Sequence, residues 1–317
     1  MQRFFLFLLA LAALLFGVDF ILARTFDAMY TRTLLGQSGG EINQYLALKP
    51  TPEALVIGNS RARYQIDPDS FAVPMYNLCH AGMGQSFQTG LLQVLELEHK
   101  LPKAVLLHVD LGEYVAEESL ADMGTLRYYY NKLPFVTEEI NNISRYERGK
   151  YFFRFYRYNG RVISQLKNYL QSRRNLPVTN GYQPLEPFAT DTVNALLAVD
   201  GGRDAKPPRF QYAHLRHLLK FIDICKKNNV KLLCFTSPYY QAHNYGPVVV
   251  APLDSLLRAQ GIPYLNTNAQ PLPLLWSHRL FWHDNDHLNR LGAPYLSQQV
   301  ARWSKPYLTA IEPSRID

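Results

Sequence analysis

The feature that most constrains the fold is a repeated alternation of short apolar runs with longer amphipathic segments. The apolar runs have the length and composition of buried strands, and they lie at residues 54–57, 75–78, 104–109, 231–236 and 263–265. The amphipathic segments predict helices at residues 85–99, 212–228, 249–260 and 292–303. Short apolar strands that alternate with helices in this order imply a parallel sheet covered by helices on both faces. We therefore expect an α/β domain, a flavodoxin-like three-layer sandwich built on a parallel sheet.

Residues from about 114 to 210 interrupt this alternation between the third and fourth predicted strands. The segment is crowded with aromatic and basic side chains, above all at residues 127–130 and 150–158, and it ends in a Gly/Pro-rich linker at residues 201–208. We interpret it as a mostly helical insertion over the carboxyl edge of the sheet. Tyrosine rings and arginine guanidinium groups suit sugar rings, anionic glycans or a membrane interface. A helical cap with solvated arginines explains the same composition.

The N-terminal segment is apolar without a break from residue 4 to 18 and continues past Asp19 to Ala23. Its length is close to the roughly 20 residues that a bilayer-spanning helix needs. Arg3 and the terminal amine favour a cytoplasmic N-terminus. We therefore expect a single-pass anchor in the cytoplasmic membrane at residues 1–24 and an extracytoplasmic domain at residues 25–317. The alternative is a cleaved signal peptide, which is disfavoured because Ile21 stands where cleavage prefers a small residue.

Charge and cysteine content narrow the classes of partner. The formal net charge of +7 is modest for 317 residues, and no nucleic-acid-binding motif accompanies it. It favours an anionic envelope surface or a solvated basic face over nucleic acid. The three cysteines, Cys79, Cys225 and Cys234, lie in or beside apolar runs without paired spacing, so we read them as small buried hydrophobic residues. We expect no cofactor.

Two short motifs supply the parts of a nucleophilic centre. Ser60 follows the first predicted strand, so its hydroxyl lies at the carboxyl end of a strand, where α/β folds bind ligands. A serine hydroxyl is a poor nucleophile unless a base takes its proton and a carboxylate orients that base. Asp284 and His287, separated by two residues, present both groups from one segment near the end of the chain.

These motifs resemble those of the SGNH (GDSL-like) hydrolases. In that family a Gly-x-Ser turn carries the nucleophile, and a late Asp-x-x-His, here followed by Leu288-Asn289, carries the rest of the triad. The resemblance implies Ser60 as nucleophile, His287 as base and Asp284 as orienter.

The first motif has Gly-Asn-Ser-Arg where Gly-Asp-Ser is usual. This variant resembles the membrane-anchored branch that includes alginate O-acetylation proteins and the D-alanyl-transfer protein of teichoic-acid loading. The resemblance implies a serine esterase or O-acyltransferase that acts on acyl esters of a cell-envelope glycan. It also implies a multispanning membrane partner that delivers acyl groups.

Two further family motifs concern the oxyanion hole. Residues 76–82 end the second predicted strand in a glycine turn, so we expect the backbone N–H groups of Gly82 and Ser60 to stabilise an oxyanion. The third motif departs from the family, because Asp110-Leu111-Gly112-Glu113 stands where an asparagine is usual. Loss of one such donor costs on the order of 10²–10³ in rate. A catalytically weak or inactive glycan-binding or scaffolding protein therefore remains the alternative function.

Four residues near the predicted strand ends are candidate substrate contacts, namely Asn59, Arg61, His80 and Asp110. For His80 the competing interpretation is a structural histidine held by a hydrogen bond. A metal site is the alternative to the triad, because imidazoles and carboxylates stand close together at residues 283–287. No second cluster of comparable density accompanies them, so we expect no metal.

Overall fold

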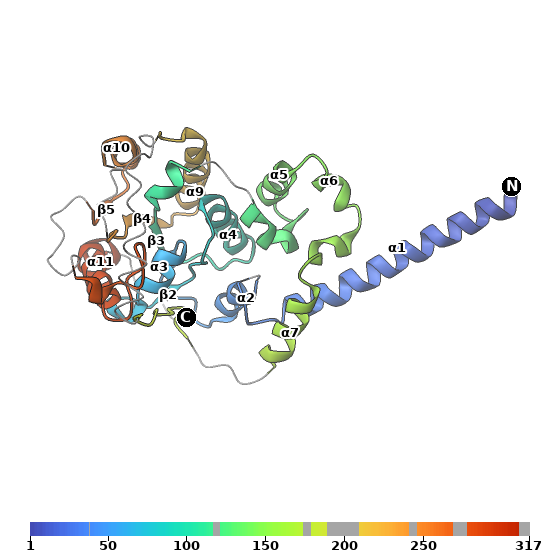
Figure 1. The fold of residues 1–317 in the computed structure, drawn as a ribbon, viewed down its shortest axis with the longest axis horizontal. Coiled ribbons are helices and arrows are strands. Elements are labelled where there is room, and N and C mark those ends of the chain that lie inside the picture. Colours follow the sequence, from blue (N-terminus) through green and yellow to red (C-terminus); the bar gives the residue numbers. More distant parts are fainter. Residues whose placement is uncertain are drawn as a thin grey trace. The chain divides into compact units, whose positions relative to one another are not determined.

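A computed structural model of the chain describes residues 1–37, 39–116, 121–173, 179–188, 209–240, 246–268 and 278–310. The chain forms two compact units (Figure 1). Unit 1 combines Met1–Ala47 with Leu120–Pro177, and unit 2 combines Leu48–Ser119 with Val178–Asp317. The predicted division ended the anchor at residue 24, whereas these units group residues 25–47 with the insertion. The predicted linker at residues 201–208 lies outside the described residues.

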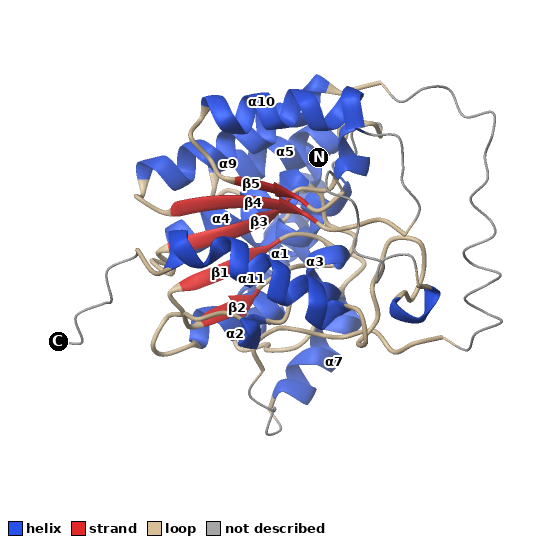
Figure 2. Cartoon of the chain, turned by 90° about the vertical axis from the view of Figure 1, so that its left-hand side faces the viewer, coloured by secondary structure: helices blue, strands red, loops and turns tan. Residues whose placement is uncertain are grey.

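Unit 2 is an α/β unit with one parallel sheet of five strands, which confirms the predicted class (Figure 2). The strands are β1 (Ala54–Ile57), β2 (Met75–Asn77), β3 (Ala104–His108), β4 (Lys231–Thr236) and β5 (Tyr264–Asn266), in the spatial order β2-β1-β3-β4-β5. Each predicted strand is present with its ends shifted by no more than one residue. The register places Ala54 of β1 opposite Met75 of β2 and Ala104 of β3.

Helices cover both faces of this sheet, because β1, β2 and β3 are buried along their whole length and need cover on both sides. In Figure 2, α3 (Ser60–Gln65) and α11 (Ala293–Leu308) lie in front of the strands, while α4 (Gln85–Leu97) and α9 (Leu215–Lys227) lie behind. Alternate strand residues such as Val56, Leu106 and Phe235 share one buried core with Ala62 of α3 and Leu296 of α11. The period of two along each strand sends the remaining residues to the other face.

The other elements in the described residues of unit 2 are α10 (Ala251–Ala259), which contacts β5, and several short turns of helix. The turns are η1 (Pro68–Ser70), η2 (Leu111–Tyr114), η5 (Tyr212–His214), η6 (Gly246–Val250) and η8 (Arg279–Phe281). The predicted helices at residues 85–99, 212–228, 249–260 and 292–303 correspond to α4, to η5 with α9, to α10 and to α11.

In its described residues, unit 1 consists of helices and the loops between them. The longest is α1 (Gln2–Tyr30), and it is long and apolar enough to cross a membrane. The others are α2 (Gly40–Ala47), η3 (Ala121–Tyr129), α5 (Pro134–Ile143), α6 (Glu147–Lys150), η4 (Arg154–Tyr158) and α7 (Val162–Ser172). The mostly helical character of the insertion is thus present in its described residues.

The insertion packs along the C-terminal half of α1. The carboxylate of Asp19 accepts the backbone N–H groups of Arg154 and Phe155 at 2.9 Å each. One turn beyond the apolar stretch, Asp27 accepts the hydroxyl of Tyr158 at 2.6 Å. The two acidic residues of α1 are therefore bound by η4, which explains how the helix continues to Tyr30, past the predicted end at Ala23.

Candidate active site

Ser60 lies where β1 ends and α3 begins, at the carboxyl edge of the sheet. The turn before it passes close to β3, because a Cβ atom on Gly58 would come within 2.6 Å of the His108 Cβ. Only glycine fits this approach. Asn59 then caps α3, as its side-chain oxygen accepts the backbone N–H of Arg61 at 3.0 Å. These local features fix the position of the Ser60 hydroxyl.

The three residues of the predicted triad form one continuous chain of hydrogen bonds. The Oγ of Ser60 lies 2.8 Å from the Nε2 of His287. The Nδ1 of the same ring lies 2.9 and 2.8 Å from the two carboxylate oxygens of Asp284. A proton on Nδ1 satisfies the carboxylate, which leaves Nε2 to accept the serine proton. The distances are those expected of a nucleophile, a base and an orienter.

A tight loop holds Asp284 beside His287. The backbone N–H of His283 donates to the carbonyl of His287 at 2.7 Å, and Trp282 forms an antiparallel bridge with Leu288. Trp282 and Leu288 are both fully buried in the core. The chain is therefore anchored on either side of the loop, which keeps the side chains of Asp284 and His287 within hydrogen-bonding distance of each other.

The carboxylate of Asp284 is held in its charged form. Burial works to raise its pKa, but the hydrogen bond and charge of His287 and two backbone N–H groups outweigh burial. The pKa of Asp284 is therefore below its ordinary value. The two N–H groups belong to Asp286 and His287, and each lies 2.8 Å from the same carboxylate oxygen. An ionised orienter at neutral pH is what a histidine base requires.

A second polar network supports the turn that carries Ser60, and it centres on Asp110 at the end of β3. The carboxylate accepts the side-chain amide of Asn59 at 2.5 Å, the hydroxyl of Tyr239 at 2.9 Å and the backbone N–H of Gly112 at 3.0 Å. The guanidinium of Arg61 lies 3.6 Å away. Burial disfavours the charged form, but Arg61 and the neutral donors outweigh it and lower the pKa of Asp110 to about 2.

Arg61 and Tyr239 connect this network to β4. The Arg61 guanidinium donates to the carbonyls of Ser237 and Pro238 at 2.8 and 2.7 Å, and it stacks on the Tyr239 ring with 3.5 Å to the centroid. Sequence reasoning alone assigns no role to Tyr239. The one signal for it is position, since residues 237–240 follow directly after the predicted strand at residues 231–236.

The two predicted oxyanion donors are the backbone N–H groups of Gly82 and Ser60. Gly82 has a φ of +72° in the turn after β2, which is closed by the Met83 N–H donating to the His80 carbonyl at 3.3 Å. Among the described residues, neither the Gly82 N–H nor the Ser60 N–H has a hydrogen-bond acceptor. The backbone N–H of Arg61, by contrast, donates to the side-chain oxygen of Asn59, which caps α3. The oxyanion role of Gly82 and Ser60 stays a prediction.

The four candidate substrate contacts have different environments. Asn59 and Asp110 bind each other beside Ser60. Arg61 is 2% exposed and His80 is fully buried. The His80 ring lies 3.1 Å from the Leu78 carbonyl through Nδ1 and packs against Phe87. In this structure Arg61 and His80 are therefore buried beside the site, and the role of all four residues as substrate contacts stays a prediction.

The histidines and carboxylates of the late loop do not converge on one point. Within the described ranges, no three His, Cys, Asp or Glu side chains are grouped as metal ligands would be. His283 turns away from the triad, with its ring stacked on Phe188 and its Nδ1 2.8 Å from the Glu186 carbonyl. The three cysteines are buried, as expected, and free.

Comparison with known proteins gives no assignment for this arrangement. No model of a known protein family matches the chain, and no curated protein is significantly similar to it.

Proposed function

We propose that the chain is a membrane-anchored serine enzyme of the SGNH type, an esterase or O-acyltransferase that acts on acyl esters of a cell-envelope glycan. The observation that carries the proposal is the chain of hydrogen bonds from Asp284 through His287 to Ser60, which joins segments 227 positions apart. The strand order β2-β1-β3-β4-β5 supports it, because this order is that of flavodoxin-like sheets, which bind ligands at the carboxyl edge.

The proposed reaction proceeds through a covalent acyl-serine. As the Oγ of Ser60 attacks the acyl carbonyl carbon, its proton passes to the Nε2 of His287 and the carbonyl π electrons move to oxygen. The N–H groups of Gly82 and Ser60 stabilise that oxyanion. When the intermediate collapses, the alcohol leaves with the proton from His287. Asp284 remains ionised and stabilises the imidazolium throughout.

The second half of the reaction decides the class of enzyme. A water or a sugar hydroxyl attacks the acyl-serine and gives its proton to the Nε2 of His287, and the Oγ of Ser60 then leaves and takes that proton back. Water makes the protein a hydrolase, and a sugar hydroxyl makes it a transferase. We infer the transferase outcome for a chain anchored by α1 with unit 2 outside the cytoplasm, supplied with acyl groups by a multispanning membrane partner.

One observation favours a second function, a glycan-binding or scaffolding protein without turnover. The third family motif lacks its asparagine, and the only side-chain amide directly adjacent to Ser60 in sequence, that of Asn59, is bound to Asp110. An oxyanion hole built from two backbone N–H groups alone is weaker than one with a third donor.

The test is covalent labelling of the full chain in detergent with a serine-reactive fluorophosphonate, together with hydrolysis of an aryl acetate. Ser60→Ala and His287→Ala should each abolish both signals, and the double variant should lose little more, because the residues act as one unit. Ser70→Ala, in η1 of the same unit, is the matched control and should label and turn over normally. Labelling that survives in Ser60→Ala, or additive losses in the double variant, would refute the triad. Absence of both signals in the unmodified chain would favour the binding protein.

A further inference from the structure

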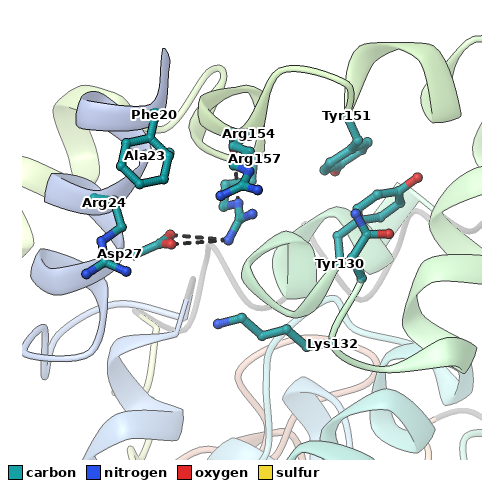
Figure 3. A pocket seen from close by; sticks show the side chains of 10 residues that line it. Phe20, Ala23, Arg24, Asp27, Tyr130, Lys132, Tyr151, Arg154 and Arg157 are labelled. Carbon is teal, nitrogen blue, oxygen red and sulfur yellow. Dashed lines mark hydrogen bonds and ion pairs between the residues drawn. The ribbon is translucent and has the colours of Figure 1, made fainter. Parts of the chain in front are cut away.

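Unit 1 contains a cavity of about 300 Å³ between α1 and the insertion (Figure 3). Helix α1 contributes Arg24 and Asp27 to its lining, and the insertion contributes Tyr130, Lys132, Arg154 and Arg157. In Figure 3 the amine of Lys132 and the guanidinium of Arg157 point across the cavity toward α1. None of these residues belongs to unit 2, so the cavity is separate from the triad.

The lining of the cavity is strongly basic. Four cationic side chains, those of Arg24, Lys132, Arg154 and Arg157, face one carboxylate, a net charge of +3. That carboxylate, Asp27, is already paired with Arg157 at 3.3 Å. Arg24 and Arg154 form no ion pair with any residue in the described part of the chain. The cavity therefore has two guanidinium charges, those of Arg24 and Arg154, that no carboxylate of the described residues neutralises.

The place of the cavity along α1 is also informative. Residues 4–23 span about 30 Å at 1.5 Å per residue, which matches the hydrocarbon thickness of a bilayer. Arg24 and Asp27 follow directly, so they fall at the depth of the lipid headgroups if α1 spans. Phe152 and Phe153 are 67% and 43% exposed, and their rings contact that of Phe16 at centroid distances of 5.4 and 5.7 Å.

This aromatic pair continues the exposed apolar surface of α1 up to the rim of the cavity. Arg154 comes next in the chain, and Asp19 holds its backbone N–H. A single turn thus places two rings against the apolar stretch and a guanidinium in the cavity. Aromatic side chains beside cations are typical of the boundary between acyl chains and headgroups.

We propose that this cavity binds the phosphate group of an anionic membrane lipid. Guanidinium forks match phosphate oxygens in pairs, and the tyrosine-lined wall gives a headgroup apolar faces to lie against. The acyl chains would then extend along Phe152 and Phe153 into the bilayer. The site rests on the membrane anchoring proposed above but not on any chemistry of Ser60. It would hold unit 1 at a fixed depth and orientation at the membrane surface.

The experiment measures lipid bound to the full chain by native mass spectrometry, after extraction from micelles that contain equal amounts of palmitoyl-oleoyl phosphatidylglycerol and phosphatidylcholine. The unmodified chain should retain phosphatidylglycerol preferentially. Arg24→Gln combined with Arg154→Gln should lower that preference about thirtyfold, the effect expected of two cations near an anionic headgroup. The matched control is Arg148→Gln combined with Arg173→Gln, which removes the same charge from exposed positions of unit 1 outside the cavity.

Each outcome decides the matter. Equal losses in the two double variants would mean a general charge effect and would overturn the site. Displacement of phosphatidylglycerol by millimolar inorganic phosphate would show a site for a soluble anion and overturn the lipid assignment. Flotation of the unmodified chain with phosphatidylcholine vesicles reports anchoring by itself. If the chain floats but does not prefer phosphatidylglycerol, only the proposed lipid site is refuted. If the chain does not float, both the membrane anchor and the lipid site are refuted.

Discussion

Replacing Asp110 by asparagine tests whether the network behind Ser60 stabilises the fold of unit 2. The substitution keeps the shape and an acceptor for the Asn59 amide, but it removes the charge opposite the buried Arg61. The lowering of the Asp110 pKa from 3.8 to about 2 means that the folded state stabilises the charged carboxylate by about 2 kcal/mol. Removing one partner of a buried ion pair costs about 3–5 kcal/mol. Because Arg61 keeps two carbonyl acceptors, we expect a loss of about 2–4 kcal/mol.

The loss should depend on pH in a definite direction. Asp110 has a folded pKa below its unfolded one, so its stabilisation is fully present above pH 3.8 and disappears as the pH falls through about 2. The difference in unfolding free energy between the unmodified chain and Asp110→Asn should therefore be constant from pH 7 to 5. At pH 3 it should fall to about half.

Tryptophan fluorescence during urea unfolding of the full chain in detergent measures this difference. All three tryptophans fall within unit 2, and Trp282 is fully buried, so the signal reports that unit. The control is Asp254→Asn, which breaks a pair with Arg258 that is exposed on both sides and should cost less than about 1 kcal/mol.

The exchange of partners sharpens the test. Asn59→Asp alone places two carboxylates where an amide and a carboxylate now lie 2.5 Å apart, and it should be more destabilising than Asp110→Asn. Combining the two substitutions restores an amide–carboxylate pair and should recover part of the stability. An Asp110→Asn variant as stable as the unmodified chain at pH 7, or a difference that grows toward acid pH, would refute the reasoning.

Three further predictions concern the site and the topology. Asp284→Asn should reduce aryl acetate turnover less than Ser60→Ala or His287→Ala, since nucleophile and base remain, and a loss as large as theirs would contradict an orienting role. Gly58→Ala should lower the melting temperature of unit 2 by at least about 5 °C and reduce labelling of Ser60, because its Cβ would lie 2.6 Å from that of His108; an unchanged melting curve would contradict the close approach. In spheroplasts, external protease should digest unit 2 and leave a membrane-bound stub with an N-terminal tag, whereas protection until lysis would place unit 2 in the cytoplasm.

The predictable parts of the structure are those set by local sequence. β1 and β4 match their predicted bounds because both are apolar runs bordered by polar or turn residues. The shorter β5 is displaced by one residue, as a three-residue run carries little register information. Asp284 and His287 could be paired from their spacing alone, because one loop carries both.

Long-range contacts account for what sequence reasoning missed. The contact of Arg61 with the carbonyl of Ser237 spans 176 positions, and no local pattern distinguishes a buried arginine of this kind from a ligand-binding one. Similarly, the predicted anchor ends at residue 24, whereas helix α1 continues to Tyr30 and its Asp27 is bound by Tyr158 from the insertion. Hydropathy marks where an apolar stretch ends, but it does not reveal that a distant segment binds the polar residues beyond.

The Asn59–Asp110 pair bears directly on how active the proposed enzyme is. In the first motif the chain has the amide of Asn59 where the SGNH resemblance expects a carboxylate. In the third motif it has the carboxylate of Asp110, where the family usually has an amide. The Asn59 amide donates to Asp110 while its oxygen caps α3, so it can turn toward an oxyanion only by breaking both interactions. Stabilisation of an oxyanion then falls to the Gly82 and Ser60 N–H groups, which have no acceptor among the described residues. The proposed mechanism thus implies an intact triad whose turnover is lower, by a factor on the order of 10²–10³, than that of a site with a third donor. Slow turnover together with fluorophosphonate labelling of Ser60 would distinguish such an enzyme from a binding protein.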